Sequence, residues 1–269
     1  YSNWFPAISL SWNKNKWSAT LACTNKTKRP NYSSLRNEVQ YDNRYLYEGG
    51  NPYLRPCVIS NIDLNVVYKW LSLNAGYNYI DKPIIWTSTL YHGKDIIFQR
   101  SLNFSNDQDL YASLVAEPRF GWYNPMFEID YSQTFLSTAG FDIEGIASKP
   151  SFRLRCNNRF DISKTIKAYL NMKYRTSVHD GLQYTKPYSQ MDIRLSKTFC
   201  KEAWQISLFA NDLFRQSKER WTTYGSRTSI TKNCYEYYRC VGLVVRYRFN
   251  TANSKYKGIG AGNAEKNRL

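Results

Sequence analysis

Apolar and polar side chains alternate along most of this chain, and residues 241–249 show the alternation most clearly. Successive side chains of a β-strand point to opposite faces of the sheet, so this run has one apolar face and one face with two arginines. The apolar positions are Val241, Leu243, Val245, Tyr247 and Phe249, and between them lie Gly242, Val244, Arg246 and Arg248. About eleven such runs, each with one apolar face, are typical of an antiparallel transmembrane β-barrel around a polar lumen.

The alternation predicts an all-β protein and locates its strands. They are expected over residues 7–12, 17–24, 62–70, 71–91, 95–117, 126–135, 152–160, 166–175, 190–199, 204–224 and 241–249. Three of these ranges, 71–91, 95–117 and 204–224, are interpreted as long continuous strands. His92 and Gly93 form the expected tip of the hairpin between the first two of them.

The connections between the expected strands differ in length. Those near residues 13–16, 70–71, 162–165 and 200–203 are very short, and the one near 119–125 is modest. Those near 26–57, 137–150, 179–187 and 225–235 are longer. Outer-membrane barrels have short periplasmic turns and longer outer loops. Five of the eight tryptophans flank the short turns, which predicts an interfacial girdle at the periplasmic rim: Trp12, Trp17, Trp70, Trp122 and Trp204.

The composition fits a barrel better than a nucleic-acid-binding domain. The formal charge is +16, and 16% of the residues are aromatic, which also suits single-strand binding. The basic residues, however, are spread over alternate positions of many strands, and no zinc spacing, RNP-like motif or helix-turn-helix pattern is present. We therefore expect no nucleic acid partner and attribute the charge to the lumen and a basic tail.

No motif in the chain indicates catalysis, a metal or a cofactor. Six cysteines lack C-x-x-C spacing; Cys23 and Cys156 fall on apolar faces, and a disulfide between outer-loop cysteines such as Cys57 and Cys234 is left open. Glu128 and Asp130 share an inward face, where ion pairing with neighbouring cations is expected. The protein is therefore not expected to be an enzyme.

The number of strands predicts an incomplete barrel. Bacterial single-chain barrels usually have an even number of strands, and a bilayer does not tolerate bare strand edges. The chain opens on Tyr1 without a signal peptide. We interpret residues 1–249 as the C-terminal part of a larger barrel domain and residues 250–269 as a basic C-terminal tail.

Three stretches resemble a known family. Residues 5–10 read FPAISL, residues 29–32 read RPNY, and residues 47–56 read YEGGNPYLRP. They resemble the FPSLSLSY, RPxY and EGNPxLxP motifs of TonB-dependent receptor-like outer-membrane proteins of Bacteroidetes type, the outer membrane protein beta-barrel family. Cys57 replaces the glutamate that commonly follows the last proline, and Gly50 resembles an insertion. The ending around Tyr247, Arg248 and Phe249 is also similar.

The resemblance implies a location in the bacterial outer membrane and a barrel of about 22 strands around an N-terminal plug. It implies nutrient uptake with outer-membrane lipid, plug and TonB as partners, although plug and TonB box lie outside this chain. A structural or adhesive barrel without energised transport is the alternative. The substrate is not predicted.

Candidate binding residues fall into two groups. The inward cations could meet acidic groups of the plug, which we favour, or attract an anionic solute. They are Arg153, Arg155, Arg159, Lys167, Lys173, Arg175, Arg194, Arg246 and Arg248. Aromatic side chains in the expected outer loops could stack on a nutrient. They are Tyr41, Tyr45, Tyr47, Trp86, Tyr91 and Trp221.

Overall fold

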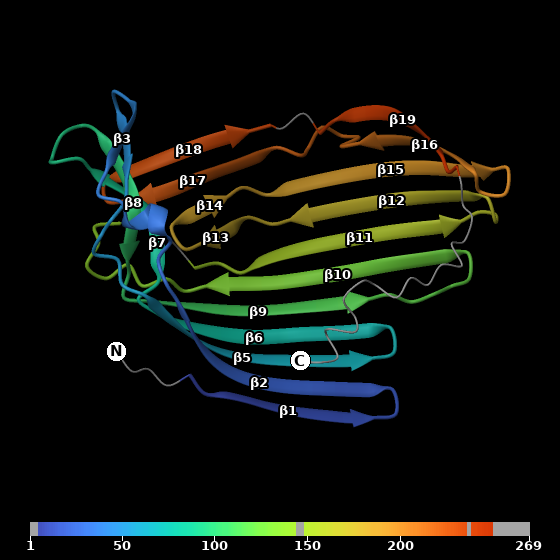
Figure 1. Cartoon of the computed structure of the whole chain (residues 1–269), viewed down its shortest axis with the longest axis horizontal. Coiled ribbons are helices and arrows are strands. Elements are labelled where there is room, and N and C mark those ends of the chain that lie inside the picture. Colours follow the sequence, from blue (N-terminus) through green and yellow to red (C-terminus); the bar gives the residue numbers. More distant parts are fainter. Residues whose placement is uncertain (1–4, 144–147, 236–237, 250–269) are drawn as a thin grey trace, which may run out of the picture.

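The computed structural model describes residues 5–143, 148–235 and 238–249 and contains one large antiparallel sheet. Its eleven strands follow one another from β1 at one edge to β19 at the other, and the sheet is not closed (Figure 1). The strands, in spatial order, are β1 (Ala7–Lys14), β2 (Trp17–Lys28), β5 (Cys57–Tyr68), β6 (Leu71–Asp81), β9 (Asn106–Ala116), β10 (Tyr123–Thr134), β11 (Ser151–Asp161), β12 (Ile166–Arg175), β15 (Tyr188–Phe199), β16 (Trp204–Asn211) and β19 (Cys240–Tyr247). The all-β barrel architecture predicted from alternation is confirmed, as an open part of a barrel.

The register of the large sheet places the apolar positions of neighbouring strands on one face. Leu21 pairs with Leu64, Leu195 pairs with Leu208, and Leu208 pairs with Leu243. Leu208 is 52% exposed although it is apolar and lies in the middle of its strand. A water-facing sheet would bury such a row, so this exposed apolar band is the membrane-facing surface.

The aromatic girdle lies at one end of the sheet. All five tryptophans beside the short turns are exposed, from Trp204 at 41% to Trp122 at 63%. Trp17 stacks on Tyr68 with ring centroids 4.2 Å apart, and Trp204 lies 4.5 Å from the ring of Tyr247 across the last strand pair, β16 and β19. The girdle predicted from sequence is therefore present at the end that carries the short turns.

Two smaller sheets stand at the other end. One contains β3 (Val39–Asn43), β4 (Leu46–Gly49), β8 (Ile97–Asn103) and β7 (Ile84–Leu90), and β4 pairs with β8 in parallel. The second contains β13 (Val178–Asp180), β14 (Gln183–Thr185), β17 (Glu219–Gly225) and β18 (Thr228–Cys234). In Figure 1 the first sheet stands across the end of the large sheet, whereas the second extends along it. We call these two the outer sheets.

The long continuous strands predicted from sequence are wrong, because each divides between the large sheet and an outer sheet. The 71–91 range breaks after Asp81, where Lys82 has a φ of 52°. The 95–117 range separates into β8 and β9 around Phe104, and the 204–224 range breaks at Asp212, with a φ of 47°. Apolar residues resume beyond each break, as at Ile84 and Trp221, and this pattern favours one longer strand.

The buried hydrophobic residues lie at the outer end. Among the described residues they are Leu54, Cys57, Phe98, Phe104 and Leu182. The ring of Phe104 stacks on Phe141 with centroids 4.0 Å apart. A hydrogen bond fixes the loop that contains Pro52 and Pro56, because the side-chain amide of Asn51 donates to the carbonyl of Ser101. Leu54 and Phe104 lie in the segments that connect the outer sheets to the large sheet, where they are shielded from water.

A tight contact joins the two outer sheets. The hydroxyls of Ser88 on β7 and Thr228 on β18 lie 2.6 Å apart, and the amide of Ser226 donates to the carbonyl of Ser88 at 2.9 Å. A Cβ at Gly225 would collide with the carbonyl oxygen of Ser88, so only glycine permits this approach. These hydrogen bonds therefore link the two outer sheets to each other at the end of the large sheet.

The remaining local predictions concern cysteine, helix and the tail. All six cysteines are free thiols, and Cys23 lies on the membrane-facing surface, paired with Ile8 and Ile62. Within the described ranges, no helix has the length and hydropathy needed to cross a bilayer. The predicted basic tail, residues 250–269, lies outside the described residues.

Candidate functional site

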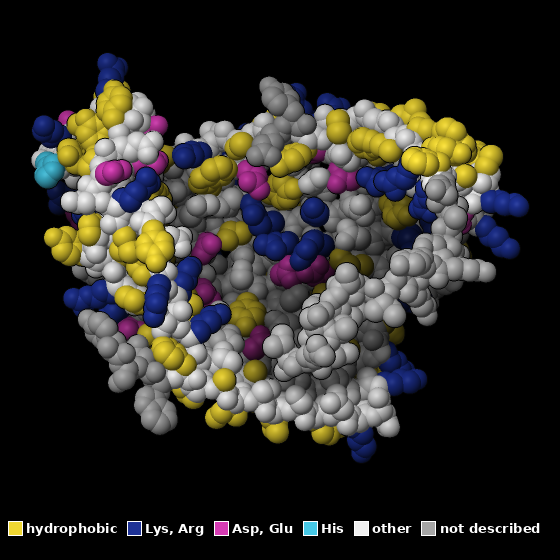
Figure 2. Space-filling view, viewed as in Figure 1, with side chains coloured by type: hydrophobic (Ala, Val, Ile, Leu, Met, Phe, Trp, Pro, Cys, Tyr) yellow, Lys and Arg dark blue, Asp and Glu magenta, His cyan; other side chains and the backbone are white. Residues whose placement is uncertain are grey.

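The hollow face of the large sheet carries the polar side chains, and Figure 2 shows Lys, Arg, Asp and Glu gathered across its middle. On β5, β6 and β9 this lumen wall is a neutral and acidic network. Asp63 accepts hydrogen bonds from Asn74 at 3.0 Å and from the hydroxyl of Tyr111 at 2.8 Å. Tyr111 lies across Gly76, where a Cβ would overlap its ring. These polar side chains of the wall are therefore hydrogen-bonded to one another.

The middle of the lumen wall is an ion-pair cluster on β10 and β11. Register places Glu128 opposite Arg155 and Asp130 opposite Arg153. Arg155 contacts Glu128 and lies 3.4 Å from Asp130, which also accepts a 2.7 Å hydrogen bond from Ser113. The expectation that Glu128 and Asp130 pair with cations is confirmed, and their geometry offers no acid–base catalyst.

The wall becomes basic on β12, β15, β16 and β19. Lys173 on β12 pairs with Arg155 on one side and with Gln190 on the other. Arg194 lies on β15, four residues beyond Gln190 and nearer to the short turns. The guanidinium of Arg194 lies 5.8 Å from the ring centre of Phe209, and that of Arg175 lies 5.6 Å from Tyr188. Such cation–π contacts stabilise the cations without neutralising them.

Several lumen cations have no carboxylate partner. Arg159 pairs with Asp161 at 2.7 Å and Arg153 lies 3.8 Å from Asp130. Among the residues that the structure describes, the other inward cations on or beside β12 to β19 have no ion-pair contact, although Lys167 lies opposite Asp161: Lys167, Lys173, Arg175, Arg194, Arg246 and Arg248. We call these six the unpaired lumen cations. They leave one side of the hollow with an excess of positive charge.

The candidate aromatic residues separate into three places. Tyr47 on β4 lies 5.1 Å from the ring of Tyr91, and Tyr91 lies 5.4 Å from Phe98 on β8. Tyr41 on β3 lies 5.7 Å from Tyr47, which makes a four-membered aromatic cluster. Sequence reasoning missed Phe98, because its place depends on the parallel pairing of β4 with β8, which are far apart in the chain.

Trp86 belongs to the opposite face of the same outer sheet. Register puts Phe98 opposite Thr89, so Trp86, three positions earlier, shares a face with Ser88 and Ser101 instead. Trp86 lines a cavity of about 450 Å³ with Arg36, Gln40 and Glu48. Trp221 lies on β17 of the second outer sheet. Four of the six aromatic candidates, Tyr47, Tyr91, Trp86 and Trp221, are thus distributed over three surfaces, and among these four only Tyr91 lies outside a strand.

The outer surfaces offer stacking and hydrogen bonding rather than chemistry. Trp86 is 41% exposed, and its cavity contains one guanidinium and carboxylates of Glu38 and Glu48. Within the described part of the chain, no group of His, Cys, Asp and Glu has an arrangement that could hold a metal ion. Recognition of a solute by shape and polarity is what this arrangement can provide.

Three solved structures share this fold. The siderophore receptor PirA from Pseudomonas aeruginosa is 14% identical with a TM-score of 0.62, and the match covers 87% of this chain and 42% of that one. A mutant of the ferric enterobactin receptor PfeA from the same organism, in complex with enterobactin, is 13% identical with a TM-score of 0.56, covering 81% and 36%. PirA from Acinetobacter baumannii is 12% identical with a TM-score of 0.53, covering 80% and 37%.

This chain therefore spans less than half the length of the receptors that it resembles in fold. None of the curated proteins matches its sequence. The family model described as the outer membrane protein beta-barrel family matches residues 1–247, which includes all eleven strands of the large sheet. Its open sheet, its exposed apolar band and this match agree: the chain belongs to the outer membrane protein beta-barrel family of the bacterial outer membrane.

Proposed function

We propose that this chain is the C-terminal half of the barrel of a non-enzymatic receptor that takes up a nutrient through the outer membrane with energy from TonB. The remaining strands and an N-terminal plug would be supplied by the rest of the protein. Outer-sheet surfaces around Tyr47, Tyr91 and Trp86 would capture the nutrient, and displacement of the plug would let it enter the lumen.

The open sheet supports the larger barrel. The outward edges of β1 and β19 would leave unpaired N–H and C=O groups in hydrocarbon, where each costs several kcal/mol. Additional strands remove both edges. The receptors of similar fold, more than twice as long as this chain, are consistent with that completion.

The unpaired lumen cations carry the proposal of a plug. Lys173 and Arg194 face a hollow whose nearby carboxylates already have partners. Glu128 and Asp130 contact Arg155, and Asp192 accepts hydrogen bonds from the side chain of Gln190 and the amide of Asp212. Both cations are exposed to the hollow, and a wall with such an excess of positive charge attracts an anionic surface. A plug with acidic side chains on this side supplies that surface, and it also closes a lumen too wide to be filled by wall side chains.

The experiment reverses charge in the lumen of the intact protein. We expect Lys173→Glu combined with Arg194→Glu to weaken plug docking, so that cells admit a bulky antibiotic that the wild type excludes. Lys164→Glu, in the exposed turn between β11 and β12, is the matched control and should leave permeability unchanged. Insertion of the purified proteins into planar bilayers should show the same difference as an increase in conductance.

The results separate the proposal from its alternatives. Unchanged permeability and conductance in the double variant would refute docking of the plug on these cations. Loss of uptake with an intact seal would assign the cations to an anionic nutrient. Uptake that persists without TonB, or no uptake at all, would favour the structural or adhesive barrel.

A further inference from the structure

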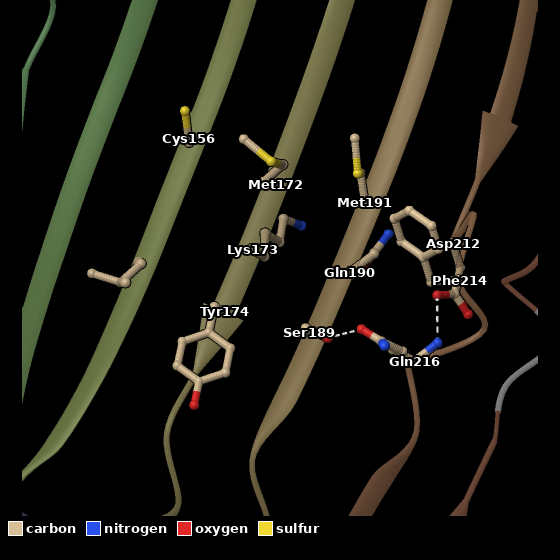
Figure 3. A pocket seen from close by; sticks show the side chains of 11 residues that line it. Cys156, Met172, Lys173, Tyr174, Ser189, Gln190, Met191, Asp212, Phe214 and Gln216 are labelled. Atoms are coloured by element: carbon tan, nitrogen blue, oxygen red, sulfur yellow. Dashed lines mark hydrogen bonds between the residues drawn. The ribbon is translucent and has the colours of Figure 1, made fainter.

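A groove of about 380 Å³ opens on the membrane-facing surface of β11, β12 and β15, and Figure 3 shows its lining. Cys156, Met172 and Met191 occupy successive positions across the three strands, because Cys156 pairs with Met172 and Met172 pairs with Met191. Leu154 and Phe214 complete the apolar part. The volume is within the range of small-molecule sites, about 300–1,000 Å³.

The groove is part of the surface that contacts lipid. Leu154 is 42% exposed, Met172 is 38% exposed and Phe214 is 64% exposed, like the rest of the apolar band. Lys173 and Gln190 are also among the lining residues, but alternation with Met172 and Met191 assigns their side chains to the lumen face of the sheet. Any occupant therefore enters from the bilayer and not from the lumen.

A fixed turn, residues 211–217, forms one wall of the groove. Asp212 is fully buried, and its carboxylate accepts hydrogen bonds from the amides of Gln216 at 2.9 Å and Ser217 at 3.2 Å. The amide of Leu213 donates to the carbonyl of Met191 at 3.0 Å, which holds the turn against β15. These bonds hold Phe214 in place beside the methionines, so the groove is built into the fold.

The polar end of the groove points to the outer rim. Tyr174 and Ser189 pair with each other one position before β12 ends and one position after β15 begins. The hydroxyl of Ser189 donates to the side-chain carbonyl of Gln216 (Figure 3). Because the short turns lie at the opposite end of these strands, the groove occupies the depth of the outer leaflet.

Exposed basic residues lie close in the chain to this polar end. Arg215 and Lys218 lie in or beside the turn, and Lys186 and Arg220 follow at the same rim, joined by a 2.9 Å backbone hydrogen bond. Glu219 is the one exposed acidic residue between residues 211 and 220. An apolar groove beneath a net positive rim matches an acyl chain attached to a phosphate-bearing headgroup.

We propose that this groove binds one acyl chain of a phosphorylated glycolipid of the outer leaflet, with the headgroup phosphate at Arg215 and Lys218. The apolar lining is continuous with the lipid-facing band, and the sugar hydroxyls of such a lipid can hydrogen-bond at the Ser189–Gln216 end. The site stands apart from nutrient capture and from the plug, since it depends only on the location in the outer membrane.

The test uses the intact protein that carries this chain, delipidated in detergent and mixed with purified lipid A. Native mass spectrometry should show one retained lipid A per wild-type barrel. Met191→Trp fills the groove and Arg215→Glu with Lys218→Glu reverses the rim, so each should weaken retention roughly tenfold. Leu208→Trp, on the same apolar band outside the groove, and Lys232→Glu, on β18, are the matched controls and should bind like the wild type.

Phosphatidylglycerol, added in a parallel series, distinguishes a specific glycolipid site from general affinity for anionic lipid. We expect it to be retained much more weakly than lipid A. The proposal is overturned if the wild type retains no lipid A, if both lipids bind equally, or if Met191→Trp and the rim variant bind lipid A like the controls. Heat-modified mobility in gels confirms that each variant has folded before its binding is compared.

Discussion

The large sheet and the outer region both contain alternating apolar and polar residues, but they bury different ones. The large sheet exposes its apolar side chains, whereas the outer region buries them. On the large sheet the apolar residues are exposed, as Leu208 is at 52%, and the charged residues point into the hollow. At the outer end, Phe98 on β8 and Phe104 just after it are buried, with exposed fractions of 8% and 2%. The difference follows from the solvent, which is hydrocarbon around one region and water around the other.

The comparison shows where each region obtains its stability. The large sheet depends on complete backbone pairing and on an apolar exterior, because lipid satisfies no hydrogen bonds. The outer sheets depend on a compact core and on the contact between Ser88, Thr228 and Gly225. A substitution that one region tolerates, such as an added charge or a lost aromatic ring, should therefore destabilise the other.

The largest expected effect concerns the edges of the large sheet. Residues 1–269 expressed alone should not fold into a closed, monodisperse monomer in detergent or vesicles, because β1 and β19 have unpaired edges. They should aggregate or pair through these edges. Size-exclusion chromatography with light scattering and protease digestion checks this, and a heat-resistant, protease-protected monomer would contradict it.

Introduced cysteines should be accessible from outside the cell in the outer region and inaccessible in the short turns. Cysteines introduced at Ser34 and Gln183, in the outer region, should react with a membrane-impermeant maleimide on intact cells. One at Asn15, in the short turn between β1 and β2, should not react. The background needs its native outer cysteines replaced, and a reversed pattern would mean that the orientation is inverted.

A cavity in the outer core should destabilise that core strongly. Phe104→Ala removes a ring that is 2% exposed and stacked on Phe141, so the loss should be about 3–5 kcal/mol in the free energy of unfolding. Tyr53→Ala, at a side chain that is 88% exposed, is the control and should change stability by less than about 0.5 kcal/mol. Denaturant titration of the intact protein in detergent measures both, and similar losses would refute the buried core.

An added charge should reduce the free energy of unfolding strongly on the membrane-facing surface and only slightly on the lumen face. Leu208→Arg should cost about 2–4 kcal/mol if it lies near the bilayer midplane, and Asn171→Arg, on the lumen face of β12, should cost much less. The same holds for arginine at Leu64 and Leu170. Folding titrations into lipid vesicles provide the values, and equal penalties on both faces would invalidate the assignment of the faces.

The smallest expected effect is the titration of His179 on β13. Removal from water, and then the positive charge of Lys149, lower the pKa of His179 below its ordinary value near 6.5. The folded state therefore favours the neutral ring, and stability should fall slightly as the pH decreases through the acidic range below 6.5. NMR of ¹³C-labelled histidine, assigned with His92→Gln, checks the direction; a pKa above the ordinary value would contradict it.

The strand positions of the large sheet could be predicted because each strand meets lipid on one face and polar groups on the other. A period of two then determines the face of every residue, as at Leu243 and Arg246, without knowledge of its neighbours. The Trp girdle was predictable for the same reason, since membrane depth is set by distance from the short turns. Motif resemblance further located the first long loop.

The outer region could not be predicted in this way. Strand breaks at Lys82 and Asp212 depend on positive φ angles that lysine and aspartate adopt only when tertiary contacts impose them. The parallel pairing of β4 with β8 brings Phe98 to Tyr47, and no local pattern encodes such a distant contact. The candidate aromatic residues were therefore identified by type, but their division among three surfaces was not.

The sequence by itself determined the fold class, the two faces of the large sheet, the end at which its short turns lie and the basic character of its lumen, because alternation and loop length are local properties. Only the tertiary structure decided which lumen cations have partners, how the outer sheets divide the long strands, and where Phe214 closes a groove against Met172 and Met191. These features depend on register and on chain reversals between distant residues, and such contacts are chosen by the packing of the whole molecule.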